Sequence, residues 1–172
     1  LAKDLPRGER LPDSKEIVEG WRQIRRFQLT SIVRPYAGNV VSSRERAETR
    51  AGVAASWWTL RVGGAWTVPA VVLEPADAKG PMETVLLLAD AGRKDAAAAE
   101  AAGKLVAEGK RVVALDPFYF GESKPAERDH LWPLMIATVG ERPLGVQVGQ
   151  VLMAARAFRP EGGKLSVSIR AI

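Results

Sequence analysis

Apolar residues recur at helical spacing near the N-terminus of this chain. The positions at that spacing are Ile17, Trp21 and Ile24. Asp13 followed by Glu16 is a capping-box pattern, in which each side chain satisfies a free backbone N–H of the first helical turn. We therefore predict a helix over residues 13–30, followed by a polar stretch, residues 36–52, whose pattern favours neither helix nor strand.

The next segment has the spacing of paired strands. Ser56–Val62 and Ala65–Leu73 are rich in Trp, Val and Thr, and they flank Gly63 and Gly64. Two glycines between such runs indicate a β-hairpin closed by a two-residue turn. Because Pro69 has no backbone N–H to donate, we expect its strand to be an edge strand or to be bulged there.

Short apolar runs alternate with helical patterns in the remainder of the chain. Thr84–Leu88 and Arg111–Leu115 each have the continuous hydrophobicity of a strand buried on both faces, and Ala96–Glu108 between them is alanine-rich and helical. This order predicts a βαβ unit with parallel strands and a right-handed crossover. A short helix over Leu131–Thr138, a helix that begins at Pro143, and a third parallel strand over Leu165–Ile172 follow. The predicted fold class is α/β: an N-terminal helix, an antiparallel hairpin, and parallel strands flanked by helices.

Composition narrows the chemistry. The 172 residues are 47% hydrophobic and 26% charged, which is typical of about one globular domain. Cysteine is absent and His130 is the single histidine, so thiolate sites, disulfides and histidine clusters are excluded. We predict no metal and no cofactor.

Charge and hydropathy argue against two classes of partner. The net charge is +5, and the first 50 residues hold 11 basic residues interleaved with 7 acidic ones. Nucleic-acid-binding proteins usually gather their basic residues on one face, so we expect no nucleic-acid partner. No run of about 18 apolar residues is present, so we expect no membrane span. Leu1 in place of Met favours a processed chain and a secreted or periplasmic location, although the compartment stays open.

In an open α/β sheet, chemistry sits beyond the carboxyl ends of the strands. Here those ends are followed by Asp90–Lys94 and by Asp116–Ser123. Asp116 is expected to hold its loop by hydrogen bonds rather than to act as a catalytic acid, and Glu122 and Ser123 border the site. Asp90 either orients its loop or caps the helix after it, and capping is the favoured reading.

The order of elements resembles the first half of the α/β-hydrolase fold. Val112–Ser123 (VVALDPFYFGES) is similar to the fourth strand of that fold and the loop after it, D-x-x-G-x-G-x-S. Asp116, Gly121 and Ser123 match that motif, whereas Phe118-Tyr119 replaces its usual Arg-Gly. Val68–Pro75 is similar to acetyl xylan esterase-like and dienelactone hydrolase-like members, and the resemblance covers residues 53–172.

The resemblance implies roles for the first loop. Asp90–Lys94 lies where the family places an oxyanion-hole donor, although the usual His is absent. The backbone N–H groups of Gly92 and Arg93 are the oxyanion candidates. The alternative is a plain strand-to-helix turn that needs glycine for its dihedral angles.

The resemblance also implies what the chain lacks. The family nucleophile follows the strand assigned to Leu165–Ile172, and no G-x-S-x-G is present. Ser166 and Ser168 lie within that predicted strand, and His130 is read as a surface or capping residue rather than a catalytic base. We therefore predict no catalytic residue in this chain.

Two domains and three functions are compatible with these observations. Residues 1–52 are read as a tail and helical extension, and residues 53–172 as the N-terminal half of a hydrolase domain. The favoured function is part of a serine-type ester hydrolase for small-molecule or carbohydrate esters. Its partner is the C-terminal half on a second polypeptide, or another copy of the chain. The alternatives are a non-catalytic α/β module and a small-molecule binding domain.

Trp57, Trp58 and Trp66 are expected to pack in the core, with sugar stacking as their alternative role.

Overall fold

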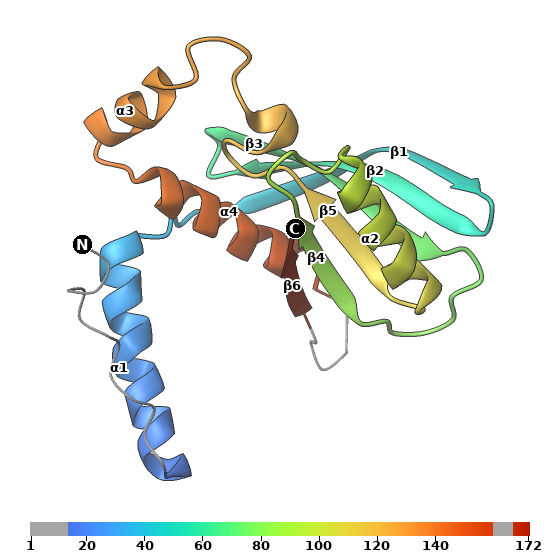
Figure 1. The fold of residues 1–172 in the computed structure, drawn as a ribbon, viewed down its shortest axis with the longest axis horizontal. Helices are drawn as coiled ribbons and strands as arrows, with labels where there is room; N and C mark the ends of the chain where they lie inside the picture. Colours follow the sequence, from blue (N-terminus) through green and yellow to red (C-terminus); the bar gives the residue numbers. More distant parts are fainter. Residues whose placement is uncertain (1–13, 160–166) are drawn as a thin grey trace. The chain divides into compact units, whose positions relative to one another are not determined.

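A six-stranded mixed sheet forms the centre of residues 35–172 in the computed structural model (Figure 1). Its strands are β1 (Val40–Arg50), β2 (Val53–Val62), β3 (Trp66–Pro75), β4 (Thr84–Leu88), β5 (Arg111–Leu115) and β6 (Val167–Ala171). The spatial order is β1-β2-β3-β5-β4-β6. The pairs from β1 to β5 in this order are antiparallel, and β4 pairs in parallel with both β5 and β6. The predicted α/β fold, a leading hairpin followed by parallel strands, is confirmed.

The structure describes residues 14–159 and 167–172, and it separates residues up to Arg34 from Pro35–Ile172. The first unit contains α1 (Lys15–Val33). Ser14 occupies the N-cap, and its hydroxyl accepts the Ile17 N–H at 3.3 Å. The predicted cap, Asp13, lies outside the described residues. The helix ends at Val33. Its C-cap, Arg34, has a left-handed backbone conformation, and the Arg34 N–H donates to the Thr30 carbonyl.

The predicted hairpin is present, with a turn one residue longer than expected. Gly63 and Gly64 both have positive φ, +59° and +74°, but the strands pair at Val62 and Trp66. Ala65 therefore belongs to a three-residue loop and not to the strand.

β3 is an internal strand, so the expectation that Pro69 marks an edge or a bulge was wrong. The ladder between β3 and β5 begins only at Ala70, opposite Leu115. The Pro69 carbonyl accepts the Asp116 N–H at 3.1 Å, so the missing proline N–H also faces the end of this ladder. Pairing with β2 on the other side is unaffected, because the N–H and C=O of one residue point to the same side of an antiparallel strand.

β1 occupies the polar stretch that the sequence pattern left unassigned. It pairs with β2 from Val40 to Arg50, and after Val40 all of its residues are exposed. Its exposed charges and an irregularity between Arg44 and Arg46 are devices that protect an edge strand from pairing with other chains.

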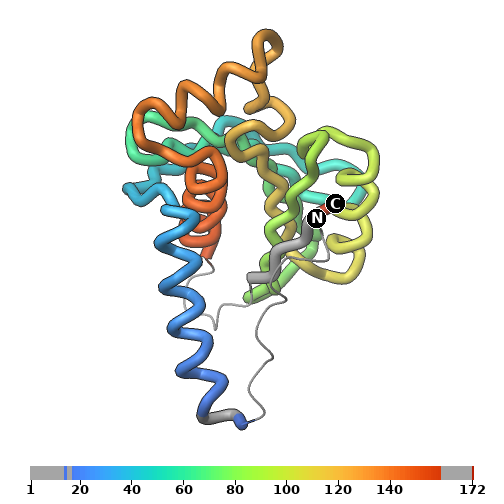
Figure 2. Tube along the Cα trace, turned by 60° about the vertical axis from the view of Figure 1, so that its left-hand side comes forward, coloured from blue at the N-terminus to red at the C-terminus, as the bar shows by residue number. Residues whose placement is uncertain are grey.

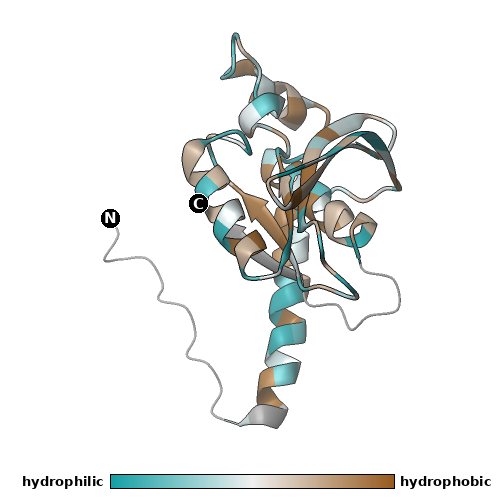
Figure 3. Ribbon diagram, turned by 90° about the vertical axis from the view of Figure 1, so that its right-hand side faces the viewer, coloured by the Kyte–Doolittle hydropathy of each residue, from teal (hydrophilic) through white to brown (hydrophobic). Residues whose placement is uncertain are grey.

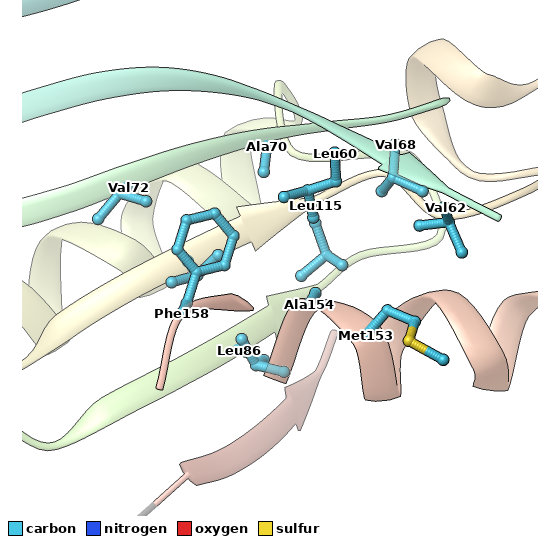
Figure 4. Close-up of a cluster of buried hydrophobic side chains, with 11 residues drawn as sticks. Leu60, Val62, Val68, Ala70, Val72, Leu86, Leu115, Met153, Ala154 and Phe158 are labelled. Carbon is cyan, nitrogen blue, oxygen red and sulfur yellow. The ribbon is translucent and has the colours of Figure 1, made fainter. Parts of the chain in front are cut away.

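Helices cover the two faces of the sheet, as Figure 2 shows. On one face, α2 (Ala96–Ala107) packs against alternate residues of the central strands, among them Val112 and Ala114. On the other face, α4 (Pro143–Ala157) and Phe158 pack against Val113 and Leu115 (Figure 4). Because alternate residues of β5 face these two helices, the strand is apolar and buried from Val112 to Leu115. The hydropathy colouring of Figure 3 shows this apolar centre.

The remaining connections follow the predicted order. η2 (Gly121–Ser123) and α3 (Leu131–Thr138) lie between β5 and α4. The third parallel strand is confirmed as β6, although Leu165 and Ser166 fall outside the described residues. Among the helices that the structure describes, none is long and apolar enough to cross a bilayer.

Candidate functional site

Two loops meet at the carboxyl ends of β4 and β5, and their backbones touch. Gly92 lies in the first loop with φ +95°, and Gly121 lies in the second with φ +42°. A Cβ atom added to either residue would fall within 3.0 Å of the Cα of the other, a separation that real Cβ atoms essentially never show. Glycine at both positions is therefore what allows the loops to approach this closely.

Asp116 holds the two loops together. Its side chain is only 1% exposed. Oδ1 accepts the Arg93 backbone N–H at 2.7 Å, and Oδ2 accepts the Glu122 backbone N–H at 3.1 Å and a guanidinium N–H of Arg93. The Asp116 carbonyl accepts the Ser123 hydroxyl at 2.7 Å. A buried carboxylate with this set of donors is engaged in loop anchoring.

The charges around Asp116 form a connected network. The Arg93 guanidinium bridges Asp116 and Glu122, and Lys94 forms a second ion pair with Glu122. The hydrogen bond from Lys94, with a further contribution from Arg93, lowers the pKa of Glu122 below its ordinary value. Glu122 is thus a carboxylate at neutral pH, and it fastens the end of β5 to the loop after β4.

This network predicts a pH effect. Because the pKa of Glu122 is lower in the folded state, its stabilising contribution is present above the unfolded pKa and is lost as the pH falls through the folded pKa. We expect Glu122→Gln to lower the unfolding temperature at pH 7 and to reduce the further loss between pH 7 and about pH 3. Thermal unfolding followed by circular dichroism at both pH values measures this. Glu127→Gln, at an exposed carboxylate of the same connection, is the control. Equal pH dependence of both variants and the unmodified chain would contradict the assignment.

Both oxyanion candidates already have partners. The Gly92 N–H donates to the Ala89 carbonyl at 2.8 Å, and the Arg93 N–H donates to Asp116. An oxyanion at either group would have to replace an existing hydrogen bond. Their oxyanion role stays a prediction that requires rearrangement of this loop.

Asp90 does not cap α2. The N-cap is Asp95, whose side chain accepts the Ala97 N–H at 2.9 Å. Asp95 directly precedes the helix and holds the N-cap position, which lies five residues after Asp90. Asp90 is exposed, and its backbone N–H extends the pairing with β6 by donating to Ile172.

The remaining candidates lie apart from these loops. The His130 side chain is 74% exposed, stands at the N-terminus of α3 without a capping hydrogen bond, and is 4.0 Å from Asp129. Ser168 lies within β6, and Ser166 lies outside the described residues. Among the described residues, no cluster of His, Asp and Glu could hold a metal ion.

The tryptophans mainly fulfil the packing role. Trp58 makes an edge-on contact with Phe158, with ring centroids 5.5 Å apart, and Trp66 makes one with Phe118 at 5.4 Å. Trp57 lies under the Arg46 guanidinium at 4.7 Å. Trp66 therefore packs against Phe118 and also lines a pocket.

Sequence reasoning missed two glutamines of α4. Gln150 accepts the Phe118 backbone N–H at 2.6 Å, and Gln147 donates to the Phe118 carbonyl at 3.0 Å. Together they hold the loop after β5 from the helix side. The available signal was their spacing of three residues, which places both on one side of a helix whose neighbouring residues are mostly apolar. Next to them lies a pocket of about 480 Å³, between the start of β3, the loop after β5 and α3.

Solved structures of other proteins share the fold that carries these loops. No family model and no curated protein matches the chain. Among solved structures, a Bacteroides fragilis protein described as an acetyl xylan esterase matches 95% of this chain, with a TM-score of 0.77 and 16% identity. A glucuronoyl esterase from Solibacter usitatus matches 95% with a TM-score of 0.57 and 14% identity. Acetyl xylan esterase 1 from a Thermoanaerobacterium species matches 94% with a TM-score of 0.58 and 12% identity.

The match covers about half of each esterase: 50%, 54% and 52% of their chains, respectively. At these identities the likeness concerns the fold. The predicted resemblance is confirmed at that level, because the neighbours are acetyl xylan esterases and related esterases of the α/β-hydrolase type. The chain has the fold of the N-terminal part of an α/β-hydrolase.

Proposed function

We propose that this chain forms the N-terminal portion of a serine-type ester hydrolase that acts on esterified carbohydrate. The observation that carries the proposal is the structural likeness to esterases, which extends over 94–95% of the chain. Two of these neighbours are described by their action on acetyl xylan and one as a glucuronoyl esterase, and all three descriptions point to carbohydrate esters. A shared fold does not by itself specify a substrate, so the substrate class belongs to the proposal.

In this function the chain contributes a rigid frame for an oxyanion site. Ester hydrolysis passes through a tetrahedral intermediate whose negative oxygen needs N–H donors held in place beforehand. The Asp116 anchor and the Gly92–Gly121 contact hold the loop after β4 against the loop after β5. Gly92 and Arg93 become donors only if their present hydrogen bonds are exchanged. Ala91 is exposed in the same turn, and among the described residues its N–H has no acceptor.

The nucleophile, the acid and the base would then come from residues outside these 172. Among the described residues, the exposed His130 and the buried Asp116 do not form a relay with any serine. β6 is the outer strand of the sheet, and no described strand pairs with its far edge. Unpaired backbone groups at a sheet edge favour the addition of another strand. We propose that the C-terminal half of the hydrolase pairs there, on a second polypeptide or as further sequence.

The test combines an activity assay with native mass spectrometry. The 172-residue chain alone should hydrolyse 4-nitrophenyl acetate no faster than buffer. Addition of the C-terminal half should give a one-to-one complex and turnover. Hydrolysis by the isolated chain that survives repurification would contradict the proposal, because it would require a nucleophile within these residues.

The second candidate is a non-catalytic α/β module. It is favoured by the occupied N–H groups of Gly92 and Arg93, which leave the loop satisfied without a substrate. A native mass spectrum that contains only this chain or its homodimer, with no ester turnover under any assembly, would support this candidate over the hydrolase.

A further inference from the structure

The pocket beside α4 contains one polar side chain from that helix, Gln150. The Gln150 side chain is 1% exposed and lines this pocket, and its Oε1 is bound to the Phe118 N–H. Its Nε2 group carries the two N–H donors of the side-chain amide. An amide NH₂ group in the lining of a pocket can donate to water or to a ligand.

Aromatic and proline side chains form the walls of the same pocket. Trp66 and the buried Phe118 line it from β3 and from the loop after β5, and Trp132 lines it from α3. Pro69 and Pro125 add further apolar surface. Trp132 is 40% exposed although it is large and apolar. Flat aromatic surface around a single amide donor suits a ligand that has apolar faces and polar edges.

The charged groups at the pocket are already neutralised. Glu122 is paired with Arg93 and Lys94, and Lys124 lies 3.8 Å from Asp129. Ser123 donates its hydroxyl proton to Asp116, so its oxygen can still accept a hydrogen bond. A charged ligand would have to compete with these pairs, whereas a neutral polyhydroxylated one would not.

We infer that this pocket, named here the Gln150 pocket, binds a neutral sugar ring. The C–H face of the ring would lie against the tryptophans. One sugar hydroxyl would accept a hydrogen bond from Gln150 Nε2, and another would donate a hydrogen bond to Ser123 Oγ. This inference rests on the proposed function, since it names where the carbohydrate part of the ester is held. The same loop that carries Glu122 and Ser123 joins the pocket to the Asp116 anchor.

Xylobiose, an unesterified sugar, is the probe, and indole N–H signals in two-dimensional NMR of the full chain are the readout. The five tryptophans give five such signals, and each is assigned with a Trp→Phe variant. Saturable shifts should affect Trp66 and Trp132 and leave Trp21 and Trp57 unchanged. Trp132→Ala should weaken binding about tenfold, because it removes an exposed stacking surface with little packing. Leu134→Ala, on the same helix, 61% exposed and outside the pocket, is the matched control and should bind normally.

Gln150→Glu adds a test of the amide. It retains an acceptor for the Phe118 N–H but removes the NH₂ donor, so xylobiose binding should be lost while the NMR spectrum stays that of a folded chain. No saturable shift with xylobiose, unchanged affinity in Trp132→Ala, or equal binding of cyclohexanol would each overturn the inference. The readout is independent of ester turnover, so failure here is distinguishable from failure of the proposed function, which 4-nitrophenyl acetate tests without any sugar.

Discussion

Replacing Asp116 with alanine should lower the free energy of unfolding by about 3–5 kcal/mol, because breaking a buried ion pair leaves its partner charge uncompensated. The Arg93 side chain is only 8% exposed and would lose its buried carboxylate. The backbone N–H groups of Arg93 and Glu122 would lose their acceptor at the same time. For a domain whose total stability is about 5–15 kcal/mol, this loss is large.

Urea denaturation, followed by tryptophan fluorescence and far-ultraviolet circular dichroism, measures this effect. Asp129→Ala is the matched control, because its carboxylate is half exposed and lies 3.8 Å from Lys124. Exposed pairs of this kind contribute about 0–1 kcal/mol. If Asp116→Ala unfolded at the same urea concentration as the unmodified chain but abolished turnover in the assembled enzyme, the anchoring role would be wrong. Asp116 would then have to act in the reaction.

Gly92→Ala should destabilise the chain by about 2–5 kcal/mol, from left-handed strain and from overpacking together. The strain arises because φ at this position is +95°. The overpacking arises because the new Cβ would meet the backbone of Gly121, which cannot move aside as the end of a flexible side chain can. Gly121→Ala should behave alike, since its Cβ would also lie 2.7 Å from the Asp116 carboxyl carbon.

Two other glycines separate these contributions. Gly109 has φ +79° with open space around it, so Gly109→Ala should show the strain alone, about 1–2 kcal/mol. Gly103 is helical and has open space, so Gly103→Ala should stabilise α2 by up to about 1 kcal/mol. Thermal and urea unfolding of the four variants gives the comparison. A Gly92→Ala variant no less stable than Gly109→Ala would show that the two loops are not in backbone contact.

Local pattern was sufficient where a segment's own residues decide its conformation. The Gly63-Gly64 turn, the alanine-rich α2 and the apolar runs of β4 and β5 were each visible in a few consecutive residues. β1 was not visible, because an edge strand exposed on both faces has no apolar alternation. Its extended conformation comes from hydrogen bonding to β2. That pairing cannot be read from the residues of β1 alone.

The candidate site divides along the same line. Asp116 was predictable as a loop anchor because it is a carboxylate directly after a buried strand. Gly121 could be singled out because it matches a glycine of the D-x-x-G-x-G-x-S motif. The partners of Asp116 were not predictable, because Arg93 lies 23 residues earlier and meets it only through the parallel pairing of β4 and β5. The same reason explains the error at Pro69, whose place in the sheet depends on where β5 ends.

Sequence alone therefore determined the order of the helices and of the strands from β2 onward, the α/β class, the residue types at the strand ends and the absence of thiol or multi-histidine chemistry. These properties follow from local periodicity, turn residues and composition. Periodicity and turn residues can be read within a few consecutive residues, and composition does not depend on contacts between residues at all. Tertiary structure decided the order of the strands in the sheet and which N–H groups of the oxyanion loop already have acceptors. It also decided the network around Arg93 and Glu122 and the pocket that Gln150 lines. Those properties depend on contacts between residues far apart in the chain, and such contacts exist only once the sheet has formed.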